Sequence, residues 1–270
     1  MSILICAFPR GGSTFTLRAL TDYLKSVYNN ATDVITSLNE PETTPPTHAT
    51  WARDYSNKPF KEVIQRYKDK KEDLSIELLK LLEKPEMNVI LKTNYLTRII
   101  NYVEFPDTVF FIFVVRAPHQ WVLSTGKNRG CIYYSLYDKT PTKEKWEEEL
   151  VDLWLEITQE VVTFVSKRTE KEYIILNYYE YVDNPAFLEK VMNEKLGFSG
   201  KMPDYTKINY KKRRNPKQAW LDIPENKLAL YRSDEIIQRF RQLGFNEDMV
   251  KEYEQKIEEI KIKIGSTEEK

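Results

Sequence analysis

Cysteine is scarce in this sequence: Cys6 and Cys131 are the two that its 270 residues contain. Small secreted folds that depend on disulfides use several cysteine pairs, so a disulfide framework is excluded and a reducing, intracellular setting is expected. Excess charge of either sign is also missing, because 41 basic and 41 acidic residues give a formal net charge of zero. Binding to a nucleic acid through bulk charge is therefore not expected. An anionic ligand must instead be bound by a local cluster of cations and backbone donors.

Long hydrophobic runs are missing as well. The apolar run at 3–8 is one strand long and leads directly into Pro9 and Arg10, which is too short for the core of a signal peptide or for a membrane helix. We expect a soluble, cytoplasmic protein without a membrane partner. Repeats and low-complexity linkers are also missing. With 41% hydrophobic and 13% aromatic residues, the chain has enough apolar material for one globular domain over 1–270.

Apolar runs of strand length alternate with segments of helical periodicity along the chain. Strands are predicted at 3–8, around 34–36, and at 88–93, 108–115 and 172–178. Helices are predicted at 14–28, 59–69, 73–84, 95–103, 118–127, 143–168 and 184–196, with two charged helices at 225–243 and 246–263. The run at 108–115 is apolar on both faces, which is typical of a central strand in a parallel sheet. This order predicts an α/β fold with a central parallel sheet flanked by helices on both faces.

Polar and basic residues follow the predicted strands, where an open parallel sheet binds its ligands. These residues are the glycine-containing loop 9–15, Lys92 with Thr93, Arg116, and 178–180. Cations, a glycine turn and hydroxyls at one edge favour a polyanionic ligand. Taken alone, the loop could be an ordinary turn in which Ser13 or Thr14 caps the next helix. Arg116 alone could simply pair with an acidic side chain.

A P-loop ATP-dependent kinase is the first enzyme class to test. Its phosphate loop needs a lysine directly before the Ser/Thr, whereas Gly12 precedes Ser13 here. Such enzymes also place an aspartate at the end of a core strand to hold Mg²⁺. The strand at 108–115 is followed by Arg116, which attracts phosphate and repels a metal ion. Both features disfavour the kinase, which stays the rival enzyme class.

These loops resemble those of the sulfotransferases that use 3′-phosphoadenosine 5′-phosphosulfate (PAPS). That family carries Pro-Lys/Arg-Ser/Gly-Gly-Ser/Thr-Thr after its first strand, matched by Pro9-Arg10-Gly11-Gly12-Ser13-Thr14. Its second signature is a strand-end arginine, then Asx/Ala-Pro, and a serine eight residues after the arginine, matched by Arg116, Ala117-Pro118 and Ser124. A looser third match is 178–185, and the matches come in the family's order over roughly 3–220.

The resemblance implies a P-loop-like three-layer fold and an enzyme. Its expected reaction transfers a sulfuryl group from PAPS to a hydroxyl and releases 3′-phosphoadenosine 5′-phosphate (PAP), with no metal. The same resemblance implies that Gly11, Gly12, Ser13 and Thr14 cradle the 5′-phosphosulfate. Arg10 stands near the bridging oxygen in place of the family's usual lysine, where a cation neutralises developing charge.

The 3′-phosphate and the adenine have candidate residues by the same resemblance. Arg116 and Ser124 would bind the 3′-phosphate. Phe15 and Tyr178 are candidates for contact with the adenine, although Tyr178 also suits a plain core position. Arg213 and Arg214 distantly resemble the loop that closes over the 3′-phosphate, although the basic run 211–214 also suits a solvated surface. His119 is expected to face the nucleotide or solvent.

The general base is the open question. Many family members use a histidine in a Lys-Thr-His stretch, but this chain has Lys92-Thr93-Asn94, and asparagine cannot accept the proton. Lys92 can still stabilise the transferring sulfuryl group. Other members use a glutamate in the loop after the first helix, so Glu40 is the first candidate for the base and His48 the second. A catalytically silent module that binds the nucleotide or a partner is the other alternative.

Two loops are expected to form the acceptor pocket. The segment 131–137 is rich in tyrosine, and the segment 41–51 contains prolines and ends at Trp51. Their aromatic content suggests a small-molecule or carbohydrate acceptor with an apolar or sugar-ring surface. Aromatic side chains in such loops also serve as lids and packing.

Overall fold

The computed structural model describes residues 2–7, 12–28, 35–39, 82, 88–93, 97, 100–125, 146–205, 230–231 and 233–255. Its strands are β1 (Ser2–Ala7), β2 (Ile35–Asn39), β3 (Asn88–Thr93), β4 (Val109–Val115) and β5 (Tyr173–Asn177). Its α-helices are α1 (Ser13–Val27), α5 (Pro118–Thr125), α7 (Trp146–Val165), α8 (Tyr178–Tyr181), α9 (Pro185–Leu196) and α11 (Asp234–Gln242). A 3₁₀ turn, η3, covers Ile100–Tyr102, and a further helix covers 247–255.

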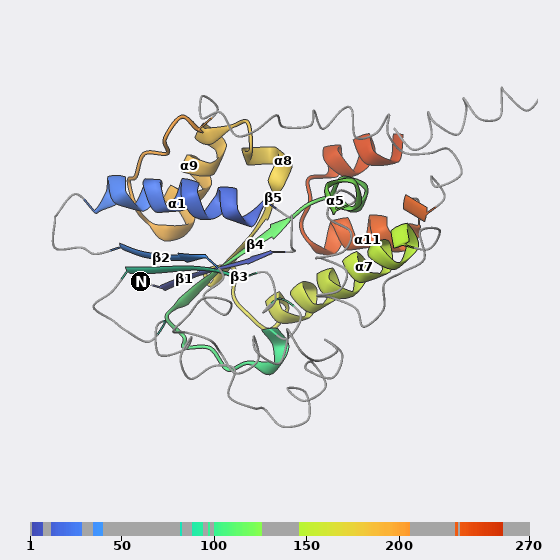
Figure 1. Ribbon diagram of the computed structural model, residues 1–270, viewed down its shortest axis with the longest axis horizontal. Coiled ribbons are helices and arrows are strands. Elements are labelled where there is room, and N and C mark those ends of the chain that lie inside the picture. The colour runs from blue at the N-terminus through green and yellow to red at the C-terminus, as the bar shows by residue number, and fades with distance from the viewer. Residues whose placement is uncertain are drawn as a thin grey trace, which may run out of the picture.

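The five strands form one parallel sheet in the order β2-β3-β1-β4-β5. The central strand, β1, lies between β3 and β4, and the chain passes first to one side of it and then to the other (Figure 1). Such a reversal leaves a crevice beyond the carboxyl ends of the strands. The residues that follow β1 and β4 therefore meet at this crevice.

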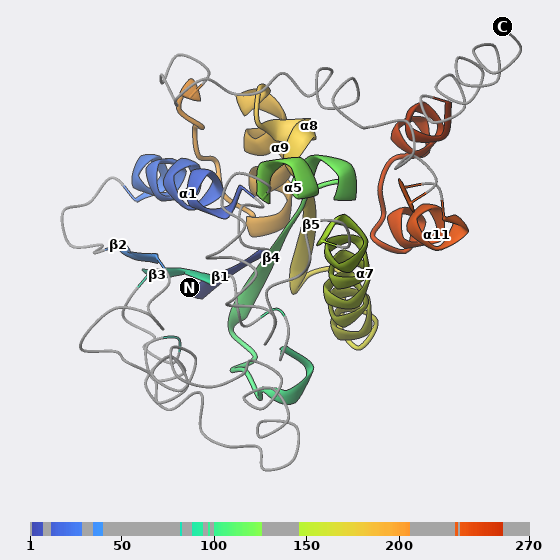
Figure 2. The same ribbon diagram turned by 45° about the vertical axis from the view of Figure 1, so that its right-hand side comes forward.

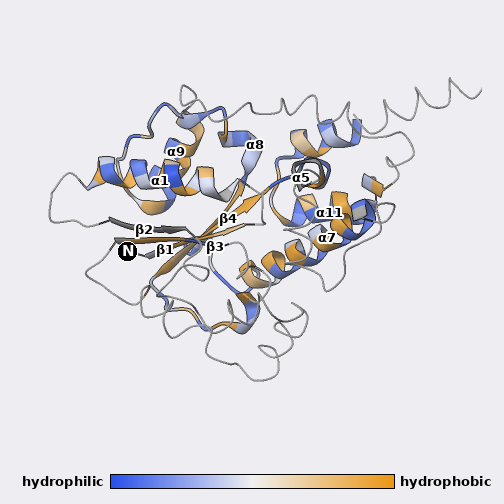
Figure 3. Cartoon of the chain, viewed as in Figure 1, coloured by the Kyte–Doolittle hydropathy of each residue, from blue (hydrophilic) through white to orange (hydrophobic). Residues whose placement is uncertain are grey.

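Side chains alternate between the two faces of the sheet and build two apolar layers. Ile3, Ile5 and Ala7 of β1 pack with α1, α8 and α9, whereas Leu4 and Cys6 pack with α5, α7 and α11. Figures 1 and 2 show α1 and α9 on one side of the sheet and α7 on the other. The strands are mostly apolar, and the helices carry apolar and polar faces (Figure 3). All seven residues of β4 are buried, as the doubly apolar run predicts.

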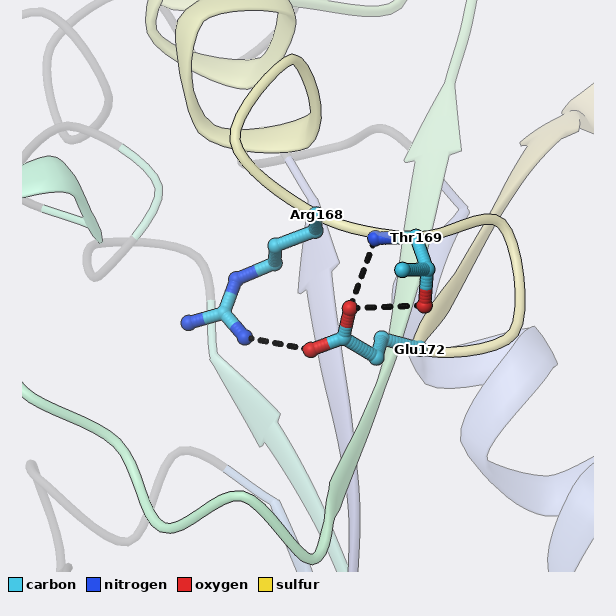
Figure 4. Close-up of polar contacts among 3 residues, drawn as sticks. All are labelled: Arg168, Thr169 and Glu172. Carbon is cyan, nitrogen blue, oxygen red and sulfur yellow. Dashed lines mark hydrogen bonds and ion pairs between the residues drawn. The ribbon is translucent and has the colours of Figure 1, made fainter.

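The turn between α7 and β5 is polar and lies at the end of the strands opposite the crevice (Figure 4). The Glu172 carboxylate accepts hydrogen bonds from the Thr169 backbone N–H at 2.6 Å and the Thr169 hydroxyl at 2.8 Å, and pairs with Arg168 at 3.2 Å. These contacts lower the pKa of Glu172, the backbone hydrogen bond most of all. The Arg168 guanidinium also lies 4.3 Å from the ring centroid of Phe164 and 4.9 Å from that of Phe111.

The predicted α/β fold with a central parallel sheet is confirmed. Each predicted strand has a counterpart, but the strand predicted at 172–178 ends at Asn177, and Tyr178 begins α8. The Asn177 side chain causes this change, because it accepts a hydrogen bond from the Tyr179 backbone N–H at 3.2 Å and caps the helix.

Two predicted helices have different boundaries. Within 95–103, residues 100–102 form a 3₁₀ turn instead of an α-helix. The helix predicted at 225–243 begins at Asp234, because the Ser233 hydroxyl accepts from the Ile236 backbone N–H at 3.3 Å. The helices predicted at 59–69 and 73–84 lie outside the described residues, apart from residue 82.

No helix within the described ranges is both long enough and apolar enough to span a membrane.

Candidate functional site

The carboxyl edge of the sheet brings together residues that follow three different strands. Gly12 follows β1, Arg116 follows β4 and Tyr178 follows β5. All three strands run in the same direction, so their ends lie at one edge. The sequence prediction that these segments converge is confirmed by direct contacts among the three residues.

Gly12 is the N-cap of α1 and lies against the ring of Tyr178. Its φ of 103° lies in the left-handed region, and a Cβ atom there would be 2.2 Å from Cδ2 and 2.3 Å from Cε2 of Tyr178. The Gly12 carbonyl accepts the first hydrogen bonds of the helix, from the Phe15 N–H at 3.0 Å and the Thr16 N–H at 3.1 Å. The expectation that Ser13 or Thr14 caps the helix is wrong, because Gly12 is the N-cap and no side chain caps it.

Arg116 is held by two tyrosines and a tryptophan. Its guanidinium carbon lies 4.4 Å from the ring centroid of Tyr178 and 5.6 Å from that of Tyr179. Its backbone carbonyl accepts from Trp154 Nε1 at 2.8 Å. Burial raises the pKa of Tyr179 to about 12, although the Arg116 charge acts in the opposite direction.

Two helices point their N-termini toward this edge. α1 begins directly after the turn that follows β1, and α5 begins two residues after Arg116. Neither first turn contains an acidic side chain. The positive ends of the two helix dipoles are therefore not neutralised by a carboxylate in the first turn. With Arg116 beside them, they can bind a ligand that carries more than one negative charge.

Solved structures share this architecture. A sulfotransferase from Alicyclobacillus acidocaldarius matches with a TM-score of 0.53 and 14% identity over 92% of this chain and 98% of that chain. A sulfotransferase domain from the curacin biosynthetic pathway matches with a TM-score of 0.52 and 17% identity, over 90% of this chain and 97% of that chain. The sulfotransferase domain of the Synechococcus PCC 7002 olefin synthase matches with a TM-score of 0.50 and 15% identity, over 91% of this chain and 95% of that chain. This chain has the sulfotransferase fold. No family model and no curated protein sequence matches it.

Lys92 lies inside this sulfotransferase fold rather than on its surface. Its side chain is 2% exposed, and its backbone position is paired with Ile5 of β1 and Asn39 of β2. Lys92 shares its face of the sheet with Ile90, which packs with the layer that contains α1. A contact between Lys92 and a transferring sulfuryl group stays a prediction.

Phe15 packs in the core of the layer that contains α1. It is 8% exposed, and its ring centroid lies 4.8 Å from that of Tyr205, 6.0 Å from Tyr181 and 6.2 Å from Tyr178. These neighbours favour a packing role for Phe15. Its predicted contact with the adenine stays untested. Thr14, one position earlier, is exposed.

The expectation that His119 faces solvent is wrong, because its side chain is buried, and a contact with the nucleotide stays a prediction. It is 1% exposed and packs 5.6 Å from the ring centroid of Tyr253 and 6.4 Å from that of Tyr231. Gln120, Trp121 and Val122, the next three residues of α5, are also buried. The sequence gives no sign of this, since the residues that cover α5 come from the C-terminal part of the chain.

Several predicted site residues lie outside the described part of the chain. They are Arg10, Gly11, Glu40, His48, Arg213 and Arg214, together with the side chains of Ser13 and Ser124 and both predicted acceptor loops. Ser124 lies in α5, eight residues after Arg116, as its spacing predicts. The roles of all these residues stay predictions.

Sequence reasoning missed Trp154 and Tyr179 as residues of this site. Trp154 is a buried residue of α7, and its hydrogen bond to the Arg116 carbonyl joins positions 38 residues apart. Tyr179 could have been found, because it follows Tyr178 within the third signature.

Proposed function

We propose that this chain is a PAPS-dependent sulfotransferase that transfers a sulfuryl group to a hydroxyl of a small-molecule or carbohydrate acceptor. One observation carries the proposal: the glycine turn after β1 and the arginine after β4 contact the same tyrosine ring. This contact supports a site in which a turn suited to anions lies beside a cation. PAPS needs such a pair, because it carries a phosphosulfate at the 5′ position and a phosphate at the 3′ position.

The residues present fit this donor. Gly12 lacks the Cβ atom that would enter the space of Tyr178, and the first turn of α1 has neither a side-chain cap nor an acidic residue. Its N–H groups are therefore suited to the 5′-phosphosulfate. Arg116 supplies in-plane N–H donors for a phosphate oxyanion. Ser124, in the next helix, α5, is the second candidate for this phosphate.

Each residue has a physical task in the proposed reaction. Arg10 and Lys92 neutralise charge that develops on the bridging and transferring oxygens. Glu40, or His48 as the alternative, accepts the proton of the acceptor hydroxyl. The bound donor supplies the sulfuryl group, which passes in line to that hydroxyl. Arg116 holds the nucleotide in place during this transfer.

The ATP-dependent kinase is less compatible with this site. Enzymes that bind ATP with Mg²⁺ place a carboxylate at the end of a core strand, and here Arg116 follows β4. The cation supplies positive charge to a phosphate directly. No feature of the described residues favours ATP over a 3′,5′-bisphosphate.

Ligand binding tests the proposal. We expect PAP to raise the Tm by several degrees, because a ligand at 100 times its Kd stabilises the folded state by about 2.7 kcal/mol. ATP with Mg²⁺ should give a smaller shift. Stabilisation by ATP with Mg²⁺ but not by PAP would refute the sulfotransferase assignment.

Two stacked arginines provide matched variants for this experiment. Arg116 and Arg168 both lie over aromatic rings, but at opposite edges of the sheet. Arg116→Gln should weaken PAP binding by about 10- to 100-fold, the usual value of charge-assisted hydrogen bonds. Arg168→Gln should lower the Tm of the free protein without changing the PAP affinity. Equal effects of the two variants on PAP binding would show that the anion lies elsewhere.

Catalysis is tested with labelled PAPS and a panel of alcohols, phenols and sugars. Transfer of label to one class identifies the acceptor. Tight PAP binding without transfer to any of them would favour the catalytically silent module.

A further inference from the structure

Tyr178 touches both of the predicted phosphate subsites. The Arg116 guanidinium lies over its ring, with the guanidinium carbon 4.4 Å from the centroid. Gly12 approaches the Cδ2–Cε2 side of the same ring so closely that no Cβ atom fits between them. The distance between the glycine turn and the arginine is therefore set by one rigid side chain.

Tyr179 completes a corner around Arg116. The rings of Tyr178 and Tyr179 are 5.4 Å apart and nearly perpendicular, at 89°. The guanidinium lies near both rings, 4.4 Å from the centroid of Tyr178 and 5.6 Å from that of Tyr179. Trp154 holds the arginine's backbone carbonyl from α7. Both ends of Arg116 are thus fixed by residues of other elements.

A fixed arginine recognises phosphate better than a mobile one. A guanidinium stacked on a ring keeps its N–H donors in its own plane, where they can bind an oxyanion in the bidentate manner. Holding the side chain in place before binding removes part of the entropy cost of ordering it. The ring face that meets Arg116 cannot stack on an adenine, so Tyr178 acts through the arginine at this face.

We propose that Tyr178 and Tyr179 are positioning residues that set the spacing between the two phosphate subsites and so make the site select nucleotides phosphorylated at both the 3′ and the 5′ positions. The inference rests on the proposed function, since it assigns the 3′-phosphate to Arg116. It adds that discrimination against 5′-monophosphates depends on side chains that need not touch the nucleotide.

The test measures the Kd of PAP and of adenosine 5′-monophosphate (AMP) for each variant by calorimetry. The readout is the ratio of the two affinities, which a general loss of stability would not change. We expect Tyr178→Leu to lower the preference for PAP by about tenfold, because the arginine loses its ring support. Tyr178→Phe keeps the ring and should stay within about twofold of the natural protein. Tyr179→Phe removes the polar hydroxyl on which the Arg116 charge acts and should lower the preference by about threefold.

Tyr23 supplies the control. Its hydroxyl donates to Asn193 Oδ1 at 2.6 Å, between α1 and α9. Tyr23→Phe therefore also removes a tyrosine hydroxyl, but without touching Arg116, and the ratio should not change. An equal change in Tyr23→Phe and Tyr179→Phe would overturn the proposal.

The remaining outcomes of the PAP and AMP binding experiment also support or overturn the proposal. If Tyr178→Leu folds and keeps the natural preference for PAP, the proposal is wrong and the proposed function stands. If Tyr178→Leu does not fold, Tyr179→Phe decides: a lowered ratio supports the proposal, and an unchanged ratio overturns it. If the natural protein binds PAP no better than AMP, the proposed function and this inference both fail.

Discussion

Gly12 and Tyr178 come so close that a Cβ atom on the glycine would lie 2.2 Å from Cδ2 of the tyrosine. The φ of 103° at Gly12 sets a second, independent requirement for glycine. The backbone conformation and the lack of space for a Cβ atom thus each require glycine at position 12. The turn after β1 can take its shape only with glycine here and with the Tyr178 ring in place.

Replacing Gly12 should therefore damage both stability and binding. Gly12→Ala combines backbone strain of about 1–2 kcal/mol with overpacking of about 1–3 kcal/mol, and it displaces the ring that supports Arg116. We expect a loss of unfolding free energy of at least about 2 kcal/mol. PAP affinity should fall at least about tenfold as well. Urea unfolding and calorimetry measure the two effects.

Gly197→Ala is the matched control. Gly197 also has a positive φ, 68°, but nothing lies within 4 Å of the position of its Cβ atom. It should therefore show only the backbone strain, about 1 kcal/mol, and bind PAP normally. If Gly12→Ala is no worse than Gly197→Ala in both measurements, the contact with Tyr178 has no energetic consequence.

The edge of the sheet at which the site lies could be predicted from local sequence alone. A run that is apolar on both faces defines β4, so the position of Arg116 directly after it follows from strand length. The parallel direction of the strands then brings Gly12, Arg116 and Tyr178 together without any knowledge of packing.

The packing around these residues could not be predicted. His119 is buried because distant residues, Tyr231 and Tyr253, cover α5, and periodicity in a short helix does not report such partners. The hydrogen bond from Trp154 to Arg116 depends on how α7 lies against β4. The start of α11 did have a local signal, because Ser233 precedes Asp234 and Glu235 in a typical capping sequence.

High pH should destabilise the protein partly through Tyr179. Its pKa is raised to about 12, chiefly by burial, whereas an unfolded tyrosine ionises near pH 10. The unfolded state therefore loses the phenolic proton first, and the stability that Tyr179 contributes is lost as the pH rises from about 10 to about 12. The loss amounts to roughly 2 kcal/mol.

Tyr179→Phe should reduce this loss of unfolding free energy at high pH. The difference in unfolding free energy between about pH 9 and about pH 11.5 should be smaller in the variant than in the natural protein. Part of the loss should persist, because burial also raises the pKa of Tyr181, Tyr231 and Tyr253. An identical pH dependence in both proteins would contradict the burial of this hydroxyl.

Low pH should act through Glu172, at the other edge of the sheet (Figure 4). Hydrogen bonds from Thr169, with Arg168 beside the carboxylate, lower the pKa of Glu172. Its stabilising contribution is therefore full above the unfolded pKa, near 4.5, and is lost as the pH falls through the folded pKa. Glu172→Gln should cost about 1 kcal/mol at neutral pH, and the difference from the natural protein should shrink in acid.

Glu194→Gln is the control for this experiment. Glu194 is an exposed carboxylate 3.9 Å from Lys190 on the same helix, and such pairs contribute little. Urea unfolding at several pH values, from neutral to acid, should separate the two variants. A constant gap between Glu172→Gln and the natural protein over this range would show that the carboxylate charge is not what stabilises the turn.

The proton acceptor can be identified within one short segment of the chain. In the proposed reaction, a carboxylate or imidazole from elsewhere in the chain accepts the proton, because Asn94 stands where many sulfotransferases have a histidine base and asparagine cannot accept it. Glu40→Gln keeps the size of the side chain but removes its basicity. It should lower kcat by about 10²- to 10⁴-fold while leaving the Kd of PAP unchanged, since the variant acts on the acceptor's proton and not on the nucleotide.

Glu42 lies two positions later in the same segment and provides a matched carboxylate, so Glu42→Gln should keep the natural kcat. His48→Gln examines the second candidate in the same assay. If kcat survives Glu40→Gln but falls with His48→Gln, the base is His48, and the kcat–pH profile should then follow an imidazole pKa instead of a carboxyl pKa. If kcat survives both substitutions, no side chain of this segment accepts the proton, because a base in contact with the reacting hydroxyl cannot be removed without loss of rate.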